Sequence, residues 1–133
     1  MSQENVELQY RAADAFNRRD LDAILALADP DVEFTSRLVR VEGGRPYRGH
    51  DGLRSWWEDL LGVYPDFRGE IEDVRDLGDV TVARLRVRGH GTGSDAPVEQ
   101  TAWFVIEWRN NKAIWWRVVL SESEALEAAG LRE

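Results

Sequence analysis

The sequence predicts an α+β domain with a mainly antiparallel sheet and helices on one side of it. Helical spacing of apolar residues is clear in residues 2–27 and 51–61, whereas alternating, β-branched segments joined by short turns fill residues 67–120. Four of the six tryptophans fall within residues 98–120. Helices followed by a run of strands with short connections are typical of α+β domains. A chain of 133 residues has the size of one domain, so we expect residues 1–133 to form a single unit.

The aromatic segment predicts a long β-hairpin around which the rest of the chain is built. Residues 101–108 and 113–120 are rich in β-branched and aromatic side chains, and two asparagines lie between them. Asparagine tolerates positive φ and suits a tight turn. Alternation assigns two apolar faces. The inner face holds Phe104, Ile106, Trp108, Ile114, Trp116, Val118 and Leu120, and the outer face holds Trp103, Val105, Trp115 and Arg117.

Because the outer face is also too apolar for water, we expect it to meet a second copy of the chain. A two-fold homodimer through Trp103, Trp115 and Arg117 is the predicted assembly.

Four helices are expected. The first covers residues 2–17 and presents Val6, Tyr10, Ala13 and either Phe16 or Asn17 on one face. Asp20 caps a short second helix over residues 21–27. The third begins near Asp51, carries a broad apolar face with two tryptophans, and stops at Gly62. A closing helix over residues 121–130 is anchored by Leu126.

The remaining strands are expected at residues 32–41, 67–74 and 80–88, with a turn at 42–46 and a loop at 89–97. One face of the strand at 80–88 is a row of arginines. We expect cross-strand ion pairs between two sets of residues: Arg84, Arg86 and Arg88 with Glu70, Glu72 and Glu107.

Composition removes several classes of function. With 25 acidic and 17 basic residues, the net charge is −8, which argues against nucleic-acid or anionic-membrane partners. The chain has no cysteine, so disulfides and thiolate metal sites are excluded. Its two histidines are 40 residues apart, and we expect no metal and no cofactor. Charges interrupt the N-terminal residues, and no apolar run approaches the ~20 residues of a membrane span. A cytoplasmic location is the default expectation.

A catalyst in an apolar pocket needs a titratable group whose pKa burial can shift. His90 and His50 are the catalytic candidates. The alternatives are that His90, which alternates with the arginines, points to solvent, and that His50 bonds a loop carbonyl. Six aromatic residues are candidates to line a pocket for a flat hydrophobic ligand, or else simply to fill the core. They are Tyr10, Phe34, Trp57, Tyr64, Phe104 and Trp116.

Four short sequence segments, in their order and spacing, resemble those of a known family. They are Ala15–Ala23, Asp29–Phe34, Tyr47–Leu53 and Glu124–Leu131. Together they resemble the nuclear transport factor 2-like superfamily and, within it, the SnoaL-like polyketide cyclase group of small bacterial proteins. The resemblance implies a strongly curved sheet wrapped around the three N-terminal helices as a cone, with an internal apolar pocket and often a dimer through the outer sheet.

The resemblance also places catalytic positions. The isomerase-type base would fall near Phe34, its phenolic donor near Ala12 with Tyr10 closest, and its second acid within residues 101–103, where no carboxylate occurs. The cyclase-type histidine would fall beside His90. The matching aspartate would fall at Ser121, next to Glu122.

The functional expectation is therefore a small apolar or polyketide-like ligand in an aromatic pocket. Any reaction would be cofactor-free acid–base chemistry such as cyclisation, isomerisation or hydration, with His90, His50 and Tyr10 as polar contacts. The alternative is a non-catalytic binding or scaffold dimer, and a third hypothesis is an adaptor that binds proteins through the outer sheet. A titratable side chain in the pocket would favour catalysis, and a lining without one would favour binding alone.

Overall fold

The structure of the chain is a computed structural model that describes residues 2–38, 46–92 and 97–132. The predicted α+β class is confirmed, and most of the turn expected at 42–46 lies outside the described residues. The elements are α1 (Ser2–Asn17), α2 (Leu21–Ala26), β1 (Ala28–Ser36), β2 (Tyr47–Arg48), α3 (Gly49–Val63), β3 (Arg68–Asp76), β4 (Val80–His90), β5 (Pro97–Arg109), β6 (Lys112–Val119) and α4 (Glu122–Arg132).

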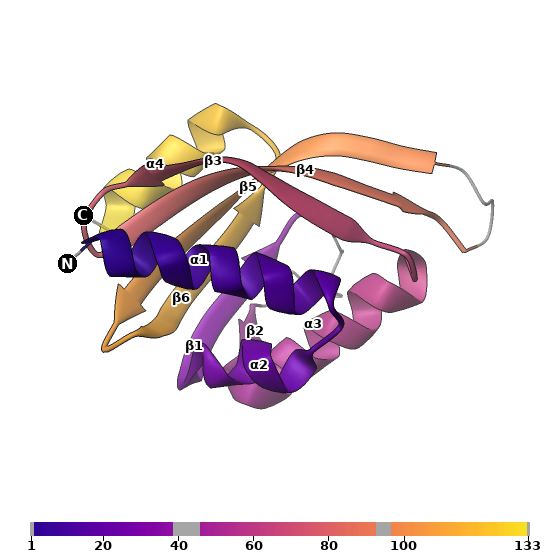
Figure 1. Cartoon of the computed structure of the whole chain (residues 1–133), viewed down its shortest axis with the longest axis horizontal. Coiled ribbons are helices and arrows are strands. Elements are labelled where there is room, and N and C mark those ends of the chain that lie inside the picture. The colour runs from indigo at the N-terminus through magenta and orange to yellow at the C-terminus, as the bar shows by residue number, and fades with distance from the viewer. Residues whose placement is uncertain (1, 39–45, 93–96, 133) are drawn as a thin grey trace.

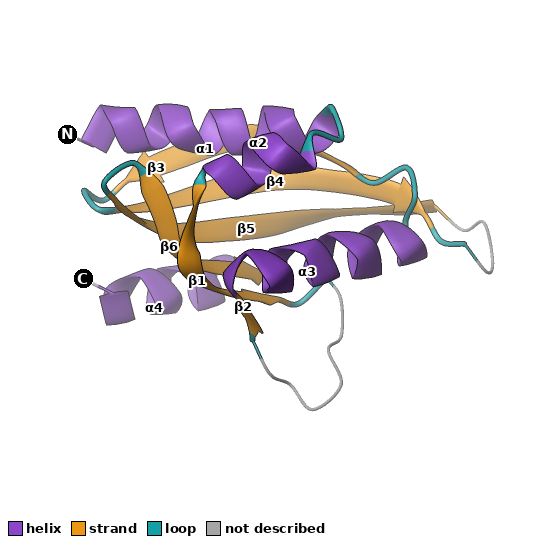
Figure 2. Cartoon of the chain, turned by 90° about the horizontal axis from the view of Figure 1, so that it is seen from below, coloured by secondary structure: helices purple, strands orange, loops and turns teal. Residues whose placement is uncertain are grey.

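The strands form one open, curved sheet in the order β2-β1-β6-β5-β4-β3. All neighbouring pairs are antiparallel except β1 and β6, which are parallel. Helix α1 crosses in front of the strands, and α4 lies beyond them (Figure 1). Seen from below, α1 and α3 run along two margins of the sheet with β4 and β5 between them (Figure 2). The three N-terminal helices thus fill the concave side, as a cone requires.

The central hairpin turns at two asparagines. Asn110 and Asn111 have φ values of 52° and 63°, so both central residues of the turn are left-handed. This geometry is the one that matches the twist of a two-residue hairpin, and the prediction from the Asn pair is confirmed. A register shift between Glu107 and Trp108 adds one residue to β6. Because of this bulge, Ile114 packs with the outer cluster, and its expected place on the inner face is wrong.

Aromatic rings from three elements meet on the inner face. The Phe34 ring centroid lies 4.7 Å from that of Trp56 and 5.1 Å from that of Trp116, and the two indoles are 6.5 Å apart. All three pairs are tilted, which is favourable for ring quadrupoles. Phe16 of α1 joins them at 5.6 Å from Trp56. These contacts hold α1, α3, β1 and β6 together.

The outer face of the sheet is covered in part by α4. Its Ala125 and Ala129, one helical turn apart, pack on a cluster of strand residues. That cluster consists of Val80, Val82, Val105, Trp115 and Val119. Leu126 is 42% exposed, so the predicted Leu126 anchor is wrong. Small alanines allow the helix backbone to approach the sheet closely.

The buried face of α1 differs from the apolar face that the sequence predicts. Tyr10 is 50% exposed, whereas Gln9, Ala12 and Phe16 are buried. Three amide side chains fasten this face to the sheet. Asn5 Nδ2 donates to the Gly78 carbonyl, Gln9 Nε2 to that of Phe104, and Asn17 Nδ2 to that of Gly69.

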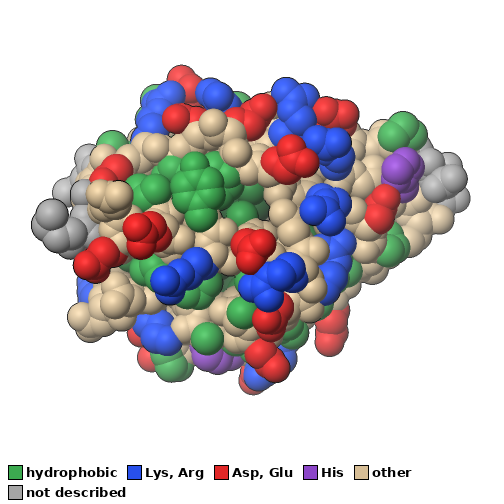
Figure 3. Space-filling view, viewed as in Figure 1, with side chains coloured by type: hydrophobic (Ala, Val, Ile, Leu, Met, Phe, Trp, Pro, Cys, Tyr) green, Lys and Arg blue, Asp and Glu red, His purple; other side chains and the backbone are tan. Residues whose placement is uncertain are grey.

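The expected ion pairs form along β3 and β4. Arg84 and Arg86 both pair with Glu72 at 3.5 Å, and Arg88 pairs with Glu70 at 3.5 Å. Glu99 of β5 takes the place predicted for Glu107, at 2.9 Å from Arg86. Basic and acidic side chains are interspersed over the face that carries α1 (Figure 3).

Two glycines of α3 predict opposite stability effects. A Cβ at Gly52 would lie 2.8 Å from the Tyr47 carbonyl carbon, whereas one at Gly62 would meet nothing within 4 Å. Gly52→Ala should lower the free energy of unfolding by about 1–3 kcal/mol through overpacking. Gly62→Ala should raise it by about 0.5–1 kcal/mol through helix propensity. Urea denaturation of both variants measures the two effects, and equal effects would contradict the close approach at Gly52.

Candidate functional site

A closed cavity lies between α1, α3 and the inner face of the sheet. Helix α1 supplies small and polar walls, among them Gln9, Ala12 and Ala13, and the opposite walls include Trp56 and Trp116. The volume open to a water-sized sphere is about 30 Å³. This volume holds one or two water molecules, whereas sites for drug-sized ligands measure about 300–1,000 Å³. The cavity as described is therefore too small for a drug-sized ligand.

No aspartate, glutamate, histidine, lysine, arginine or tyrosine is among the described residues that line this cavity. Its polar atoms come from two amides and two indoles. Asn17 is fully paired with the backbone of Gly69, donating at 2.8 Å and accepting at 3.1 Å. Gln9 donates to the Phe104 carbonyl at 3.1 Å. The lining has no group that changes its charge between pH 2 and pH 12.

Three buried polar atoms around the cavity lack a hydrogen-bond partner in the described part of the chain. They are Gln9 Oε1, Trp56 Nε1 and Trp116 Nε1. All three residues line the cavity, and each side chain is at least nine-tenths buried. The residues around the cavity thus carry one hydrogen-bond acceptor and two donors without a partner.

The six aromatic candidates lie at different distances from this cavity. Phe104 and Trp116 line it. Phe34 is fully buried behind Trp56 and Trp116. Trp57 and Tyr64 pack against residues that line the cavity: the Trp57 ring is 5.1 Å from Phe16, and the Tyr64 ring is 6.4 Å from Phe67. Tyr10 lies on the exposed face of α1 and is not a lining residue.

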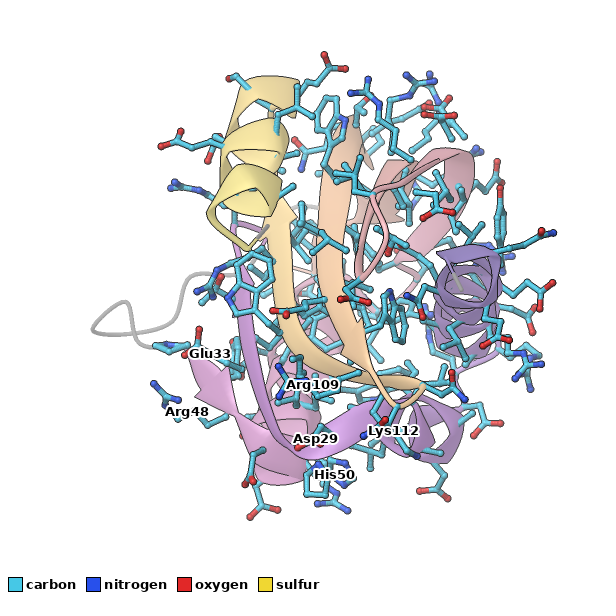
Figure 4. The ribbon with its side chains drawn as sticks, turned by 90° about the vertical axis from the view of Figure 1, so that its left-hand side faces the viewer. Asp29, Glu33, Arg48, His50, Arg109 and Lys112 are labelled. Carbon is cyan, nitrogen blue, oxygen red and sulfur yellow. The ribbon has the colours of Figure 1, made fainter. Side chains whose placement is uncertain are left out.

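His50 lies outside the cavity at the start of α3. Its Nε2 is 2.9 Å from the carbonyl oxygen of Ala28, next to Asp29 at the beginning of β1 (Figure 4). This contact joins α3 to β1, which is the structural alternative that the sequence offered for His50.

His90 lies at the exposed end of β4, also outside the cavity. Its Nδ1 is 2.6 Å from Asp66 Oδ2, and its backbone N–H donates to Asp66 Oδ1 at 2.7 Å. The hydrogen bond from the His90 ring, followed by that from its backbone, lowers the pKa of the Asp66 carboxyl. The pair lies in an open groove that also contains Pro65, Thr92 and Pro97. The two histidines are therefore separated from the apolar cavity.

A second polar cluster lies on the outer face of β1 and β6. The Arg117 guanidinium donates to Glu33 at 2.9 Å and to Thr35 at 2.6 Å, and it stacks over Trp115 at 4.8 Å. Arg48 adds an ion pair to Glu33 at 3.3 Å, at the sheet edge (Figure 4). Arg117 thus belongs to the outer face. The homodimer through this face stays a prediction, and α4 already covers part of it.

Within the described ranges, no group of three histidine, cysteine, aspartate or glutamate side chains is arranged to hold a metal ion. None of the helices described there is long and apolar enough to cross a membrane.

The described chain is thus an α+β cone with a small interior cavity, and the described side chains that line this cavity are uncharged. The SnoaL-like domain family matches residues 10–116, more than half of the chain, and the protein belongs to this family. The resemblance found in the sequence is thereby confirmed. A search of curated proteins finds no match.

Solved structures of the same fold are numerous, and their identity to this chain is low. A protein of unknown function from Burkholderia pseudomallei, described as nuclear transport factor 2-like, is 20% identical, with a TM-score of 0.79 over 93% of this chain and 95% of its own. A putative SnoaL-like polyketide cyclase from Jannaschia is 17% identical, with a TM-score of 0.78 over 96% and 92%. IdmH, a putative polyketide cyclase from Streptomyces antibioticus, is 21% identical, with a TM-score of 0.74 over 93% and 96%. These similarities establish the fold.

Of the three cavity residues with an unpartnered polar atom, Gln9 and Trp56 are not among the sequence-based candidates. Gln9 is a polar residue on a helix face expected to be exposed. Trp56 and Trp57 share the broad apolar face predicted for the third helix, and Trp56 rather than the candidate Trp57 lines the cavity. The spacing of Leu8, Ala12, Ala15 and Phe16 is the sequence signal that marks the buried face of α1, and Gln9 lies within that face.

The contact between His90 and Asp66 predicts a measurable titration. The Asp66 carboxyl should titrate below the ordinary aspartate value of about 3.9, because His90 donates to its ionised form. A carboxyl with a lowered folded-state pKa stabilises the fold above its unfolded pKa, and this stabilisation is lost as the pH falls through the folded value. Carbon-detected NMR titration measures the Asp66 pKa directly. In His90→Ala the pKa should rise only part of the way, because the backbone hydrogen bond remains; an unchanged pKa would contradict the ring contact.

Proposed function

We propose that the chain binds a small, flat, neutral molecule in the interior of the cone and does so without acid–base catalysis by the cavity walls. The observation that carries this proposal is the lining itself, in which the described residues include no titratable side chain. The sequence offered this feature as the discriminator between catalysis and binding, and it favours binding.

The lining also limits the ligand's charge. An ion that enters an apolar site without a counter-charge loses its hydration and gains little in return. The described lining has no cation for a carboxylate or phosphate and no carboxylate for an ammonium group. Aromatic rings such as Phe104 and Trp116 instead favour stacking with another flat ring. A neutral aromatic or polycyclic molecule fits these conditions.

Entry of such a molecule requires one wall to move, because the cavity measures about 30 Å³. The strands are held by continuous hydrogen-bonded ladders. Helix α1 is instead attached to the sheet by side chains, including the amides of Asn5, Gln9 and Asn17. We assign the movement to α1, whose displacement breaks the fewest backbone hydrogen bonds.

The family suggests what the ligand resembles. Two of the structural neighbours are described as putative polyketide cyclases, so a polyketide-like ring system is a consistent ligand class. In this chain, the catalytic candidates His90 and His50 make contacts outside the cavity. Donors such as the indole N–H groups can orient a bound carbonyl but cannot remove a proton from it.

A cavity-filling variant tests the location of binding. Ala13→Leu adds a larger side chain at the cavity wall and should weaken binding of flat polycyclic ketones by about tenfold or more, since overpacking costs about 1–3 kcal/mol. Arg11→Leu places the same side chain on the exposed surface of α1 and should leave the affinity within about twofold. Intrinsic tryptophan fluorescence, calibrated by calorimetry, measures both. Equal effects of the two variants would place binding elsewhere.

The absence of titratable groups from the described lining also predicts the pH dependence. The dissociation constant for a neutral ligand should change by less than about twofold between pH 5 and pH 8, because no wall group gains or loses a proton there. Calorimetric titration at several pH values measures it. A bell-shaped profile, or slow conversion of the ligand with such a profile, would contradict binding without acid–base chemistry.

A further inference from the structure

The three unpartnered atoms of the cavity form a specific chemical pattern. Gln9 Oε1 is an acceptor, whereas Trp56 Nε1–H and Trp116 Nε1–H are donors. Gln9 and Trp56 are each 2% exposed and Trp116 is 4% exposed, so none of the three is hydrated from the outside. Buried polar groups are normally satisfied, so three exceptions around one cavity require a partner, which is either a buried water molecule or a group of a ligand.

The orientation of the Gln9 amide follows from its paired end. The group it faces on β5 is the carbonyl oxygen of Phe104, which only accepts hydrogen bonds. The amide nitrogen must therefore be the atom at 3.1 Å from that carbonyl, and the amide oxygen is the atom left without a partner. The acceptor character of this position is thus set by the backbone and not by a choice of rotamer.

We propose that the ligand carries a hydroxyl group that donates to Gln9 Oε1 and accepts from an indole N–H of Trp56 or Trp116. This proposal rests on the proposed function and assigns Gln9 as a specificity-determining residue. A hydroxyl is the smallest neutral group that both donates and accepts, so it can satisfy both kinds of atom at once.

Other polar groups match the pattern less well. A ketone or ether oxygen accepts from the indoles but leaves Gln9 Oε1 unpaired. An ammonium group donates to Gln9 but leaves both indoles unpaired and brings a charge without a counter-ion. A carboxylate accepts twice but meets no cation in the described lining. Among these groups the pattern favours an alcohol, and the apolar aromatic lining favours an aromatic or polycyclic one, of which a phenol is the simplest.

A single buried water is the competing occupant, since about 30 Å³ is enough for one. A hydroxyl that replaces this water reproduces its hydrogen bonds, whereas an ether replaces only those that it accepts. If water is the only partner of the three atoms, ligands that enter the cone do not touch Gln9, and their hydroxyl groups have no effect on affinity.

The test compares 2-naphthol with 2-methoxynaphthalene, which accepts a hydrogen bond but cannot donate one, with naphthalene as the apolar reference. Wild-type protein should bind 2-naphthol about five- to tenfold tighter than 2-methoxynaphthalene, the factor expected for one neutral hydrogen bond in a buried site. Isothermal titration calorimetry measures all three affinities.

Gln9→Met, which keeps the length of the side chain and removes its polar atoms, should reduce that preference to less than about twofold. The two probes also differ in size, but this difference is the same in wild type and in Gln9→Met. It therefore cancels when the preference of one protein is compared with that of the other. Asn5→Met is the matched control, because it removes another amide bond from α1 to the sheet away from the cavity and should keep the full preference. If Gln9→Met does not fold, Gln9→Asn withdraws the amide by one methylene and should also lose the preference.

The outcomes separate this proposal from the proposed function. Binding of all three probes without preference in wild type, or a preference that survives in Gln9→Met, overturns the role of Gln9 and leaves the apolar site intact. Binding of none of the probes overturns both. Loss of the preference in Gln9→Met, with naphthalene affinity within about threefold of wild type, supports the proposal.

Discussion

The apolar character of both faces of the β5–β6 hairpin is the constraint on which the rest of the structure depends. A sheet face with large exposed apolar area is not left to water, so each face needs a covering layer. Helices α1, α2 and α3 cover the inner face, and α4 covers part of the outer one. The inner layer does not fill completely, because α1 presents Ala12 and Ala13 and β3 presents Gly69 where they face one another. The cavity is therefore a consequence of small residues between large aromatic ones.

Short-range rules account for most of the fold. Alternation identified the strands, helical spacing identified the helices, and the Asn110–Asn111 pair identified the turn, because each feature depends on neighbouring residues. The parallel pairing of β1 with β6 joins segments about 80 residues apart, and no local signal specifies it. The bulge that moves Ile114 to the outer face breaks the period of two by a single residue. The packing of α4 on Ala125 and Ala129 rather than on Leu126 depends on contacts with distant strands, which the helix sequence alone does not specify.

Less of the candidate site than of the fold can be predicted from the sequence, because part of the site depends on contacts between distant segments. Phe104 and Trp116 follow directly from alternation within the hairpin. On α1, Gln9 lies among the buried residues Leu8, Ala12 and Phe16, whereas the expected apolar face includes Tyr10, which is exposed. Local hydrophobicity does not identify a polar residue that is buried because the backbone of another element accepts its hydrogen bond. The Gln9 amide fastens α1 to the sheet through its nitrogen, and its oxygen is the unpaired acceptor at the cavity.

The energetics of this arrangement favour specificity over affinity. If the open form is populated at about 1%, the apparent affinity falls about a hundredfold, which corresponds to about 2.7 kcal/mol. Each buried polar atom left unpaired costs about 1–3 kcal/mol, so a ligand that pairs two of the three offsets a cost of that size. A purely apolar ligand must open the cone and still leaves Gln9, Trp56 and Trp116 unpaired. A charged ligand adds its own desolvation. Such a site discriminates between ligands through the polar atoms that a wrong ligand leaves unpaired. In a closed cavity, bulk water cannot pair with those atoms instead.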